Sequence, residues 1–178
     1  MLRRILIYGL IAGVIVAIPT SLLPILLKDH LPLATGMVIG YTSMLVAFSM
    51  VFLAIKRQRD EAGGGVIRFF PALGLGLAVS VVASIFYVAA WELAMAVTHM
   101  DFVAGYSRTA LAEAKASGAS AAALAKLTAQ LAELRRNYAN PLYRYGETFT
   151  EIFPVGVLVS LISAALLRNS RFLPARRA

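Results

Sequence analysis

The sequence predicts an all-α integral membrane protein: a four-helix bundle in the membrane, with an extramembrane helical hairpin between helices three and four. Of its 178 residues, 60% are hydrophobic and 15% are charged, and the mean hydropathy is +0.76. Soluble domains are nearer to about 45–50% apolar and about 25% charged residues. Several apolar runs also exceed the roughly 18 residues that indicate a membrane span. These observations exclude an ordinary soluble domain.

The first two predicted spans cover residues 5–27 and 33–55. Arg3 and Arg4 precede the first span, as basic residues precede the apolar core of a signal peptide. That core is usually only about 7–15 residues long, so we expect an uncleaved transmembrane helix instead. Residues 28–32 form a tight connection to the second span.

The third predicted span, residues 69–97, is longer than the roughly 20 residues that a bilayer requires, so we expect it to tilt or to project. Residues 98–147 predict a helical hairpin outside the membrane, in which Ser120 suits an N-cap. Leucines spaced alternately by three and four residues predict one apolar stripe on its second arm. The stripe packs on the first arm, on the membrane surface or on a second chain. The fourth span is residues 148–167, and a basic tail follows at 168–178.

All four spans contain small residues at four-residue spacing, which lets membrane helices approach closely. The predicted packing residues are Gly9, Gly13, Gly36, Gly40, Gly76, Ser80, Ser84, Gly156 and Ser160. We expect these residues to pack helices within one chain, and the alternative is that one of the stripes forms a dimer.

The net charge of +8 is concentrated in the short flanks of the apolar runs. This pattern is typical of the positive-inside rule, so it predicts a topology and not a nucleic-acid partner. With four spans, both termini and the second loop are expected in the cytoplasm. The hairpin then lies on the other side, which in a bacterial inner membrane is the periplasm. The lipid bilayer is the expected partner.

Glu151 places a carboxylate inside a segment that is otherwise lipid-soluble, at a cost of about 2.5–3.5 kcal/mol near the bilayer centre. A rise of about 1.5 Å per residue puts Glu151 about 24 Å from the inner end of its span. The same count predicts a polar layer that also contains Thr20, Ser21, Tyr41 and Tyr87, with Glu92 nearer the interface. One interpretation of this layer is a proton-coupling or ligand-binding site. The other is a structural role, in which Glu151 is a hydrogen-bonded tie between helices or an acid in the first turn of its helix, near Pro154.

The only two histidines, His30 and His99, are expected at the outer face near Asp29 and Asp101. Histidine with carboxylates can bind zinc, but these residues lack a helical ligand spacing, and His–Asp pairs at helix ends are ordinary. The chain has no cysteine, which excludes disulfides and thiol catalysis. Serine-hydrolase and zinc-protease motifs are absent as well. We therefore expect no enzyme activity and no cofactor.

Several segments resemble a known group of proteins. Residues 40–49 in the second span, 151–156 and 160–164 in the fourth, and 115–118 and 140–142 in the polar region are similar to the bacterial membrane family catalogued as domain of unknown function 4199. The resemblance covers nearly the whole chain. It implies a small four-helix integral membrane protein, and it implies no activity and no catalytic residues.

The sequence predicts a non-enzymatic accessory or assembly subunit whose hairpin contacts a periplasmic or membrane protein or a second copy of the chain. The alternative is a small oligomeric transporter or channel in which Glu151 is the coupling or binding carboxylate. An intramembrane enzyme is the third interpretation.

Overall fold

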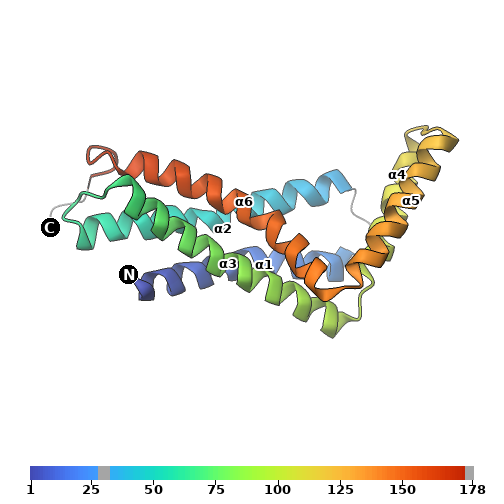
Figure 1. The fold of residues 1–178 in the computed structure, drawn as a ribbon, viewed down its shortest axis with the longest axis horizontal. Coiled ribbons are helices and arrows are strands. Elements are labelled where there is room, and N and C mark those ends of the chain that lie inside the picture. The colour runs from blue at the N-terminus through green and yellow to red at the C-terminus, as the bar shows by residue number, and fades with distance from the viewer. Residues whose placement is uncertain (28–32, 175–178) are drawn as a thin grey trace.

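A computed structural model describes residues 1–27 and 33–174, and all regular elements in these ranges are helical. The helices are α1 (Leu2–Leu27), α2 (Leu33–Arg57), α3 (Phe69–Thr98), α4 (Phe102–Ala116), α5 (Ala121–Tyr138) and α6 (Pro141–Leu167), with a short π-helix at Gln58–Ala62 (Figure 1). Helices α1, α2, α3 and α6 are long and apolar enough to cross a membrane. The all-α class is therefore confirmed, and the structure contains the four helices that could serve as the predicted spans.

The four long helices expose much apolar surface. In the most apolar 18 residues of each, no more than 44% of the residues are buried within the protein. Large side chains such as Leu6, Leu10, Val38 and Leu45 are exposed. Apolar surface of this extent marks contact with a membrane or a partner, and for helices of this length the membrane is the expected solvent.

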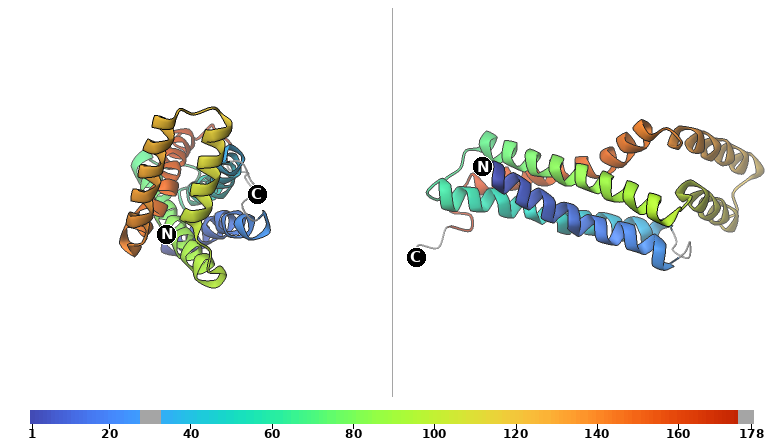
Figure 2. Two further views of the ribbon diagram at one scale, coloured as in Figure 1. Left: turned by 90° about the vertical axis from the view of Figure 1, so that its right-hand side faces the viewer. Right: turned by 90° about the horizontal axis from the view of Figure 1, so that it is seen from below.

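Helix α3 lies between α1 and α6, and α2 contacts both α1 and α6. Figure 2 shows these four helices side by side, with the α4–α5 hairpin beyond one of their ends. The core between them is apolar and includes Phe48, Val51, Leu75, Val79 and Ile152. Glu151 lies in α6, so the packing of α6 against α3 sets the position of this residue.

Glycines allow α1 to approach α3 closely. A Cβ atom on Gly9 would lie 2.6 Å from Val82 Cβ, and one on Gly13 would lie 2.7 Å from Phe86 Cβ. Real Cβ atoms do not come this close to a neighbour, so only glycine fits at these two positions.

The close contact between α3 and α6 also depends on small residues, and both helices supply them. A Cβ atom on Gly156 would lie 2.7 Å from Ser80 Cβ, and one on Gly76 would lie 2.8 Å from Ser160 Oγ. The two serine hydroxyl oxygens are 3.3 Å apart, within hydrogen-bonding distance. Small residues on both helices therefore form one interlocked contact near the middle of the membrane helices.

Three of the predicted packing residues, Gly36, Gly40 and Ser84, differ from the small residues that form these close contacts. Among the described residues, a Cβ atom on Gly36 or Gly40 would meet nothing within 4 Å, so neither glycine packs against a described part of another helix. The four-residue spacing only places residues on one helix face, and this face of α2 is turned away from its neighbours. Ser84 is buried as expected, yet its hydroxyl has no hydrogen-bond partner among the described residues.

The start of α1, the end of α6 and the loop after α2 lie at the same end of the molecule (Figure 1). At this end the Arg59 side chain is fully buried. Its guanidinium donates hydrogen bonds to the carbonyl oxygens of Phe172 (2.8 Å) and Leu173 (2.5 Å) and to Asp60 Oδ1 (2.7 Å). The segment after α6 is thereby pinned to the loop after α2.

Helices α4 and α5 form the predicted hairpin. Asp101 caps α4 by accepting a hydrogen bond from the Ala104 amide at 2.9 Å, and Ser120 caps α5 by accepting one from the Ala123 amide at 3.2 Å. Gly118 turns the chain between the arms with a φ of 77°, a left-handed conformation that suits glycine.

The leucine stripe of α5 packs on α4. Leu131 is buried, and Leu124, Leu127 and Leu134 are half-buried. Helices α4 and α5 contact each other along the hairpin. The first arm therefore covers the stripe, which was one of the three alternatives open from the sequence.

Helix α6 begins earlier than the fourth span predicted at residues 148–167. It starts at Pro141, where the Asn140 side chain accepts a hydrogen bond from the Leu142 amide at 3.0 Å. Proline suits this position because the first helical amides have no partner within the helix. The polar residues 141–147 thus extend the long helix and are not part of the hairpin. Pro154 lies inside the same helix.

Candidate functional site

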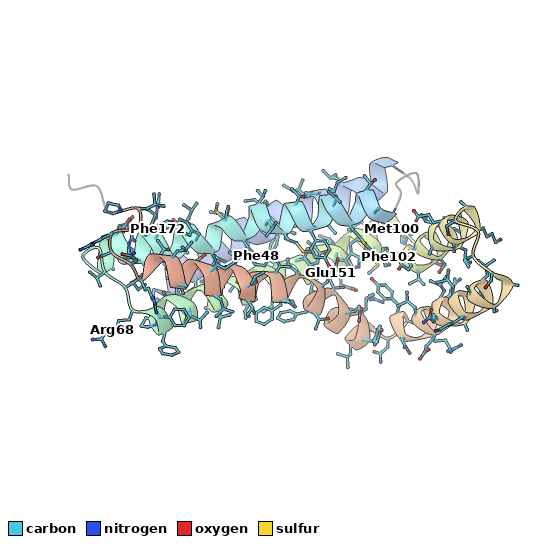
Figure 3. The ribbon with its side chains drawn as sticks, turned by 90° about the horizontal axis from the view of Figure 1, so that it is seen from above. Phe48, Arg68, Met100, Phe102, Glu151 and Phe172 are labelled. Atoms are coloured by element: carbon cyan, nitrogen blue, oxygen red, sulfur yellow. The ribbon has the colours of Figure 1, made fainter. Side chains whose placement is uncertain are left out.

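A cavity of about 420 Å³ lies where the hairpin meets the long helices, and all six α-helices contribute to its walls. Helices α1, α2 and α3 contribute Thr20, Met37, Tyr87 and Trp91. Helices α4 and α5 contribute Phe102, Tyr106, Leu134 and Tyr138, and α6 contributes Glu147, Thr148 and Glu151. We call this space the hairpin cavity. Figure 3 shows Glu151 between Phe48, in the middle of the long helices, and Phe102, at the base of the hairpin.

The cavity wall on α6 carries two carboxylates. Glu147 and Glu151 are four residues apart, so their side chains lie on the same helix face, where like charges destabilise a helix by about 0.2–0.5 kcal/mol. Both residues are exposed. Neither forms an ion pair with any residue in the described parts of the chain. This side of the cavity is therefore a site of unbalanced negative charge.

Tyr87 supplies a polar group from α3. Its side chain is only 4% exposed, and it lines the cavity together with Thr20 of α1. The Thr20 hydroxyl also donates a hydrogen bond to the Val16 carbonyl oxygen at 2.9 Å. Thr20 and Tyr87 thus bring polar groups of α1 and α3 to the same cavity wall.

Aromatic side chains close the cavity on the hairpin side. Trp91 Nε1 donates a hydrogen bond to the Tyr138 hydroxyl at 2.9 Å. The Phe102 ring stands edge-on to Trp91, with ring centroids 5.2 Å apart, and its centroid is 5.6 Å from that of Tyr138. Rings from α3, α4 and α5 therefore form one continuous aromatic wall.

The Tyr138 hydroxyl belongs to the hairpin, outside the long helices. Burial raises the pKa of this hydroxyl above its usual range, while the hydrogen bond from Trp91 opposes the shift. A tyrosine with a raised pKa remains a neutral phenol at physiological pH. Tyr138 therefore adds no charge to the cavity wall.

Glu92 lies beside the cavity in a separate interaction. Its carboxylate accepts two hydrogen bonds from Arg144 of α6, from Nε at 2.6 Å and from Nη2 at 2.5 Å. Arg144 Nη1 also donates to the Tyr138 carbonyl oxygen at 3.2 Å. This two-pronged ion pair holds the start of α6 against α3.

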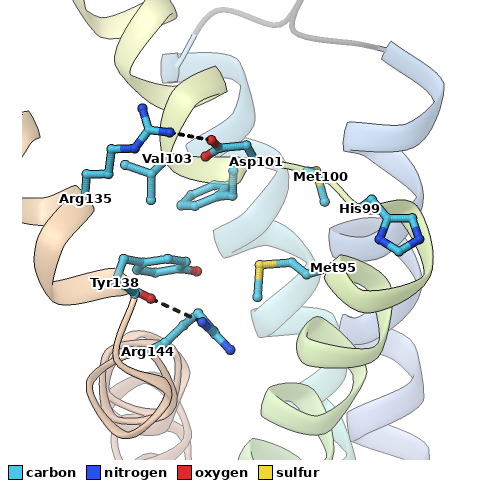
Figure 4. A pocket seen from close by; sticks show the side chains of 10 residues that line it. Met95, His99, Met100, Asp101, Val103, Arg135, Tyr138 and Arg144 are labelled. Atoms are coloured by element: carbon cyan, nitrogen blue, oxygen red, sulfur yellow. Dashed lines mark hydrogen bonds and ion pairs between the residues drawn. The ribbon is translucent and has the colours of Figure 1, made fainter.

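A second cavity, of about 340 Å³, lies on the other side of Tyr138 and is shown in Figure 4. His99 and Arg144 contribute to its walls, and so do Asp101 and Arg135, which form an ion pair of 2.9 Å. More of the charged side chains in this second cavity form ion pairs than in the hairpin cavity, where neither glutamate has an ion-pair partner among the described residues.

The structure brings together only part of the predicted polar layer. Thr20, Tyr87 and Glu151 all line the hairpin cavity. Tyr41 is 54% exposed and does not line it, and Ser21 is not part of its wall. Glu92 is paired with Arg144 instead.

The metal hypothesis has no geometric support in the described residues, since no three His, Asp or Glu side chains there come close enough to hold an ion. His99 ends α3 in a left-handed conformation with φ of 52°. His30 lies outside the described residues.

The sequence did not predict that most of the aromatic wall, or Glu147, belongs to this site. Phe102, Tyr106 and Tyr138 were expected in a hairpin outside the membrane, and Glu147 was placed there too. A signal was present, because Phe102 and Tyr106 are one helical turn apart and so share a face.

Residues 7–169 match the family described as Protein of unknown function (DUF4199). The matched range includes every residue that lines the hairpin cavity. Comparison with curated proteins and with solved structures gives no match.

Proposed function

Because the chain belongs to the DUF4199 family, whose description assigns no activity, we propose a function from its geometry: it is a membrane protein that binds a small ligand in the hairpin cavity. The binding is non-enzymatic and uses no cofactor. The resemblance found in the sequence named this family, and the match confirms it.

The observation that carries the proposal is the shared wall of the cavity. Six helices meet there, and they bring polar groups from α1, α3 and α6 to one space of about 420 Å³. Ligand sites typically measure about 300–1,000 Å³ and combine an apolar lining with a few polar groups.

The orientation follows from charge. Basic residues gather at the end where α1 begins and α6 ends, among them Arg3, Arg4, Arg57, Arg68 and Arg168. The positive-inside rule assigns this end to the cytoplasm. The hairpin cavity then opens on the opposite side, which in a bacterial inner membrane is the periplasmic side.

Mass spectrometry of the intact protein tests the binding function. The wild-type protein, extracted in mild detergent, should carry a small molecule that is retained in the gas phase. Leu134→Trp fills the cavity from α5 and should abolish this adduct, whereas Leu142→Trp, at an exposed position of α6, should keep it. Equal adducts on both variants, or none on the wild type, would contradict the proposal.

A second candidate is transport through the same cavity. Pro154 follows Glu151 by three residues within α6, and proline lacks the amide that would bond the carbonyl four residues back. Interrupted helices beside a midplane site are a feature of transporters. A pH-dependent flux in proteoliposomes that Glu151→Gln abolishes would favour this candidate over simple binding.

The accessory-subunit candidate depends on the hairpin. Figure 1 shows α4 and α5 projecting beyond the long helices, and the outer face of α5 exposes Lys126, Glu133 and Arg136. A stoichiometric partner that co-purifies with the wild type, and that charge reversal at Lys126 and Arg136 removes, would favour this candidate. The leucine stripe offers no such surface because α4 covers it.

A further inference from the structure

We infer that the hairpin cavity selects a small organic cation, namely an ammonium group attached to an apolar body. The inference rests on the proposed binding function and adds the chemical class of the ligand. Three properties of the wall support it: its charge, its aromatic rings and its lack of a metal-binding geometry.

The charge of the wall is negative and unbalanced. Glu147 and Glu151 line the cavity, and no Lys, Arg or His is among the described residues that line it. Neither carboxylate has an ion-pair partner in the described chain. Two like charges in a partly apolar space are unfavourable, and a bound cation relieves this by pairing with both. An anionic ligand would meet the same charges as repulsion.

The remaining wall suits the body of an ammonium ion. Tyr87, Trp91, Phe102, Tyr106 and Tyr138 present aromatic rings to the cavity. The faces of such rings attract cations, and aromatic cages recognise quaternary ammonium groups by this interaction. The rings also shield the methyl or methylene groups around the charge from water.

An inorganic cation fits less well. Calcium takes about 6–8 oxygen ligands, whereas the described residues contain no group of three acidic or histidine side chains close enough to share an ion. Much of the wall is aromatic and can give a metal ion no ligand. The combination of two carboxylates with five rings therefore favours an organic cation.

The protein carries its own reporter, because Trp91 is the only tryptophan in the chain and lines the cavity. The test uses the protein in nanodiscs of phosphatidylglycerol, whose headgroup contains no ammonium. Three probes of similar shape are titrated: benzyltrimethylammonium, its neutral carbon analogue neopentylbenzene, and the anion benzylsulfonate. Protein-free nanodiscs give the correction for partition into lipid.

Benzyltrimethylammonium should change the Trp91 emission in a saturable way and should bind at least about tenfold more tightly than the other two probes. The variant with both Glu147→Gln and Glu151→Gln should lose about tenfold or more of the affinity for the cation and keep its response to neopentylbenzene. Glu133→Gln, which removes a carboxylate from the exposed face of α5, should match the wild type.

Equal affinity for neopentylbenzene would overturn the cation selectivity and leave the proposed binding function intact. The absence of saturation with all three probes would also overturn the inference, and the adduct measured on Leu134→Trp then judges the binding function separately. If the double variant does not fold, the three probes on the wild-type protein still decide.

An ammonium group can come from a soluble amine or from a lipid headgroup. Repeating the titration in nanodiscs that contain phosphatidylethanolamine distinguishes the two sources. A lipid ligand weakens the apparent affinity for benzyltrimethylammonium in proportion to its fraction, and a soluble ligand leaves that affinity unchanged. Either result keeps the ammonium specificity and identifies where the group comes from.

Discussion

At the scale of single residues, the attachment of the hairpin depends on Arg144. This side chain is 19% exposed, and it bonds both carboxylate oxygens of Glu92, which is 23% exposed. Its guanidinium also lies 5.7 Å from the centre of the Tyr138 ring, within range of a cation–π interaction. Arginine is suited to this place because its planar fork matches a carboxylate at two points.

Replacing Arg144 by alanine should lower the free energy of unfolding by about 2–4 kcal/mol, since it leaves a half-buried Glu92 carboxylate without its partner. SDS-titrated unfolding followed by Trp91 emission measures this loss. Arg135→Ala is the matched control, because Arg135 and Asp101 form a pair that is 65% and 54% exposed. Such surface pairs contribute only about 0–1 kcal/mol. Similar losses in the two variants would show that the Glu92 pair has no special role.

Counting residues along the helices predicted the composition of the cavity wall only in part. Counting residues placed Thr20, Tyr41, Tyr87 and Glu151 at one height. A helix turns by about 100° per residue, so equal heights leave the facing side open. Three of these residues line the cavity, whereas Tyr41 is 54% exposed and is not part of its wall, although Met37, one turn earlier in α2, is.

At the scale of elements, the interlocked contact of α3 and α6 depends on the lack of side chains. Gly156→Ala brings a methyl group within 2.7 Å of Ser80 Cβ and 2.8 Å of Phe48 Cζ. It should therefore destabilise the protein by about 1–3 kcal/mol, the usual range for overpacking. Thermal unfolding in detergent measures the change.

The matched control for Gly156 is Gly40→Ala, because an added Cβ at Gly40 meets nothing within 4 Å. This substitution should leave the stability unchanged or raise it by up to about 1 kcal/mol, since alanine is the better helix former. A marked loss at Gly40 would mean that this face of α2 is covered by a second chain in the membrane.

The segment after α6 is an element held by one side chain. Ending the chain at Ser170 removes the carbonyl oxygens of Phe172 and Leu173 and leaves the buried Arg59 guanidinium with fewer acceptors. The loss of stability should be about 1–3 kcal/mol. Ending the chain at Pro174 keeps both acceptors and should have little effect on the thermal unfolding temperature. Equal unfolding temperatures for the two truncations would contradict the role of Arg59.

The ends of the helices show where sequence signals were sufficient. Ser120 was predicted as an N-cap and accepts the expected hydrogen bond. At α6 the apolar pattern placed the start at residue 148, because hydropathy records where lipid-soluble residues begin and not where the helix begins. The cap at Asn140 and the proline at 141 set the true start.

At the scale of the whole molecule, the chain is suited to a topology test because it contains no cysteine. Ser117 at the hairpin turn and Ser170 after α6 are both exposed. An impermeant maleimide added to intact cells, or to spheroplasts of a bacterium, should label Ser117→Cys. It should label Ser170→Cys only after the membrane is opened. The reverse labelling pattern would show that the protein has the opposite orientation in the membrane.

The membrane class and the family could be predicted from the sequence because both depend on long segments. Apolar runs of this length permit few other structures, and the family match spans residues 7–169. The hairpin cavity could not be predicted in the same way. It depends on the angle at which the hairpin returns to the long helices, which is set by side chains such as Trp91, Glu92 and Arg144 together.

Helix α6 connects the two ends of the molecule. It runs about 40 Å from Pro141, at the base of the hairpin, to Leu167 at the opposite end of the molecule. Near its middle, Gly156 is held against Ser80. Buried residues that include Ile152, Ser160, Ala164 and Leu167 continue this packing along the helix. One helix therefore joins the wall of the hairpin cavity to the segment that Arg59 holds at the opposite end of the molecule.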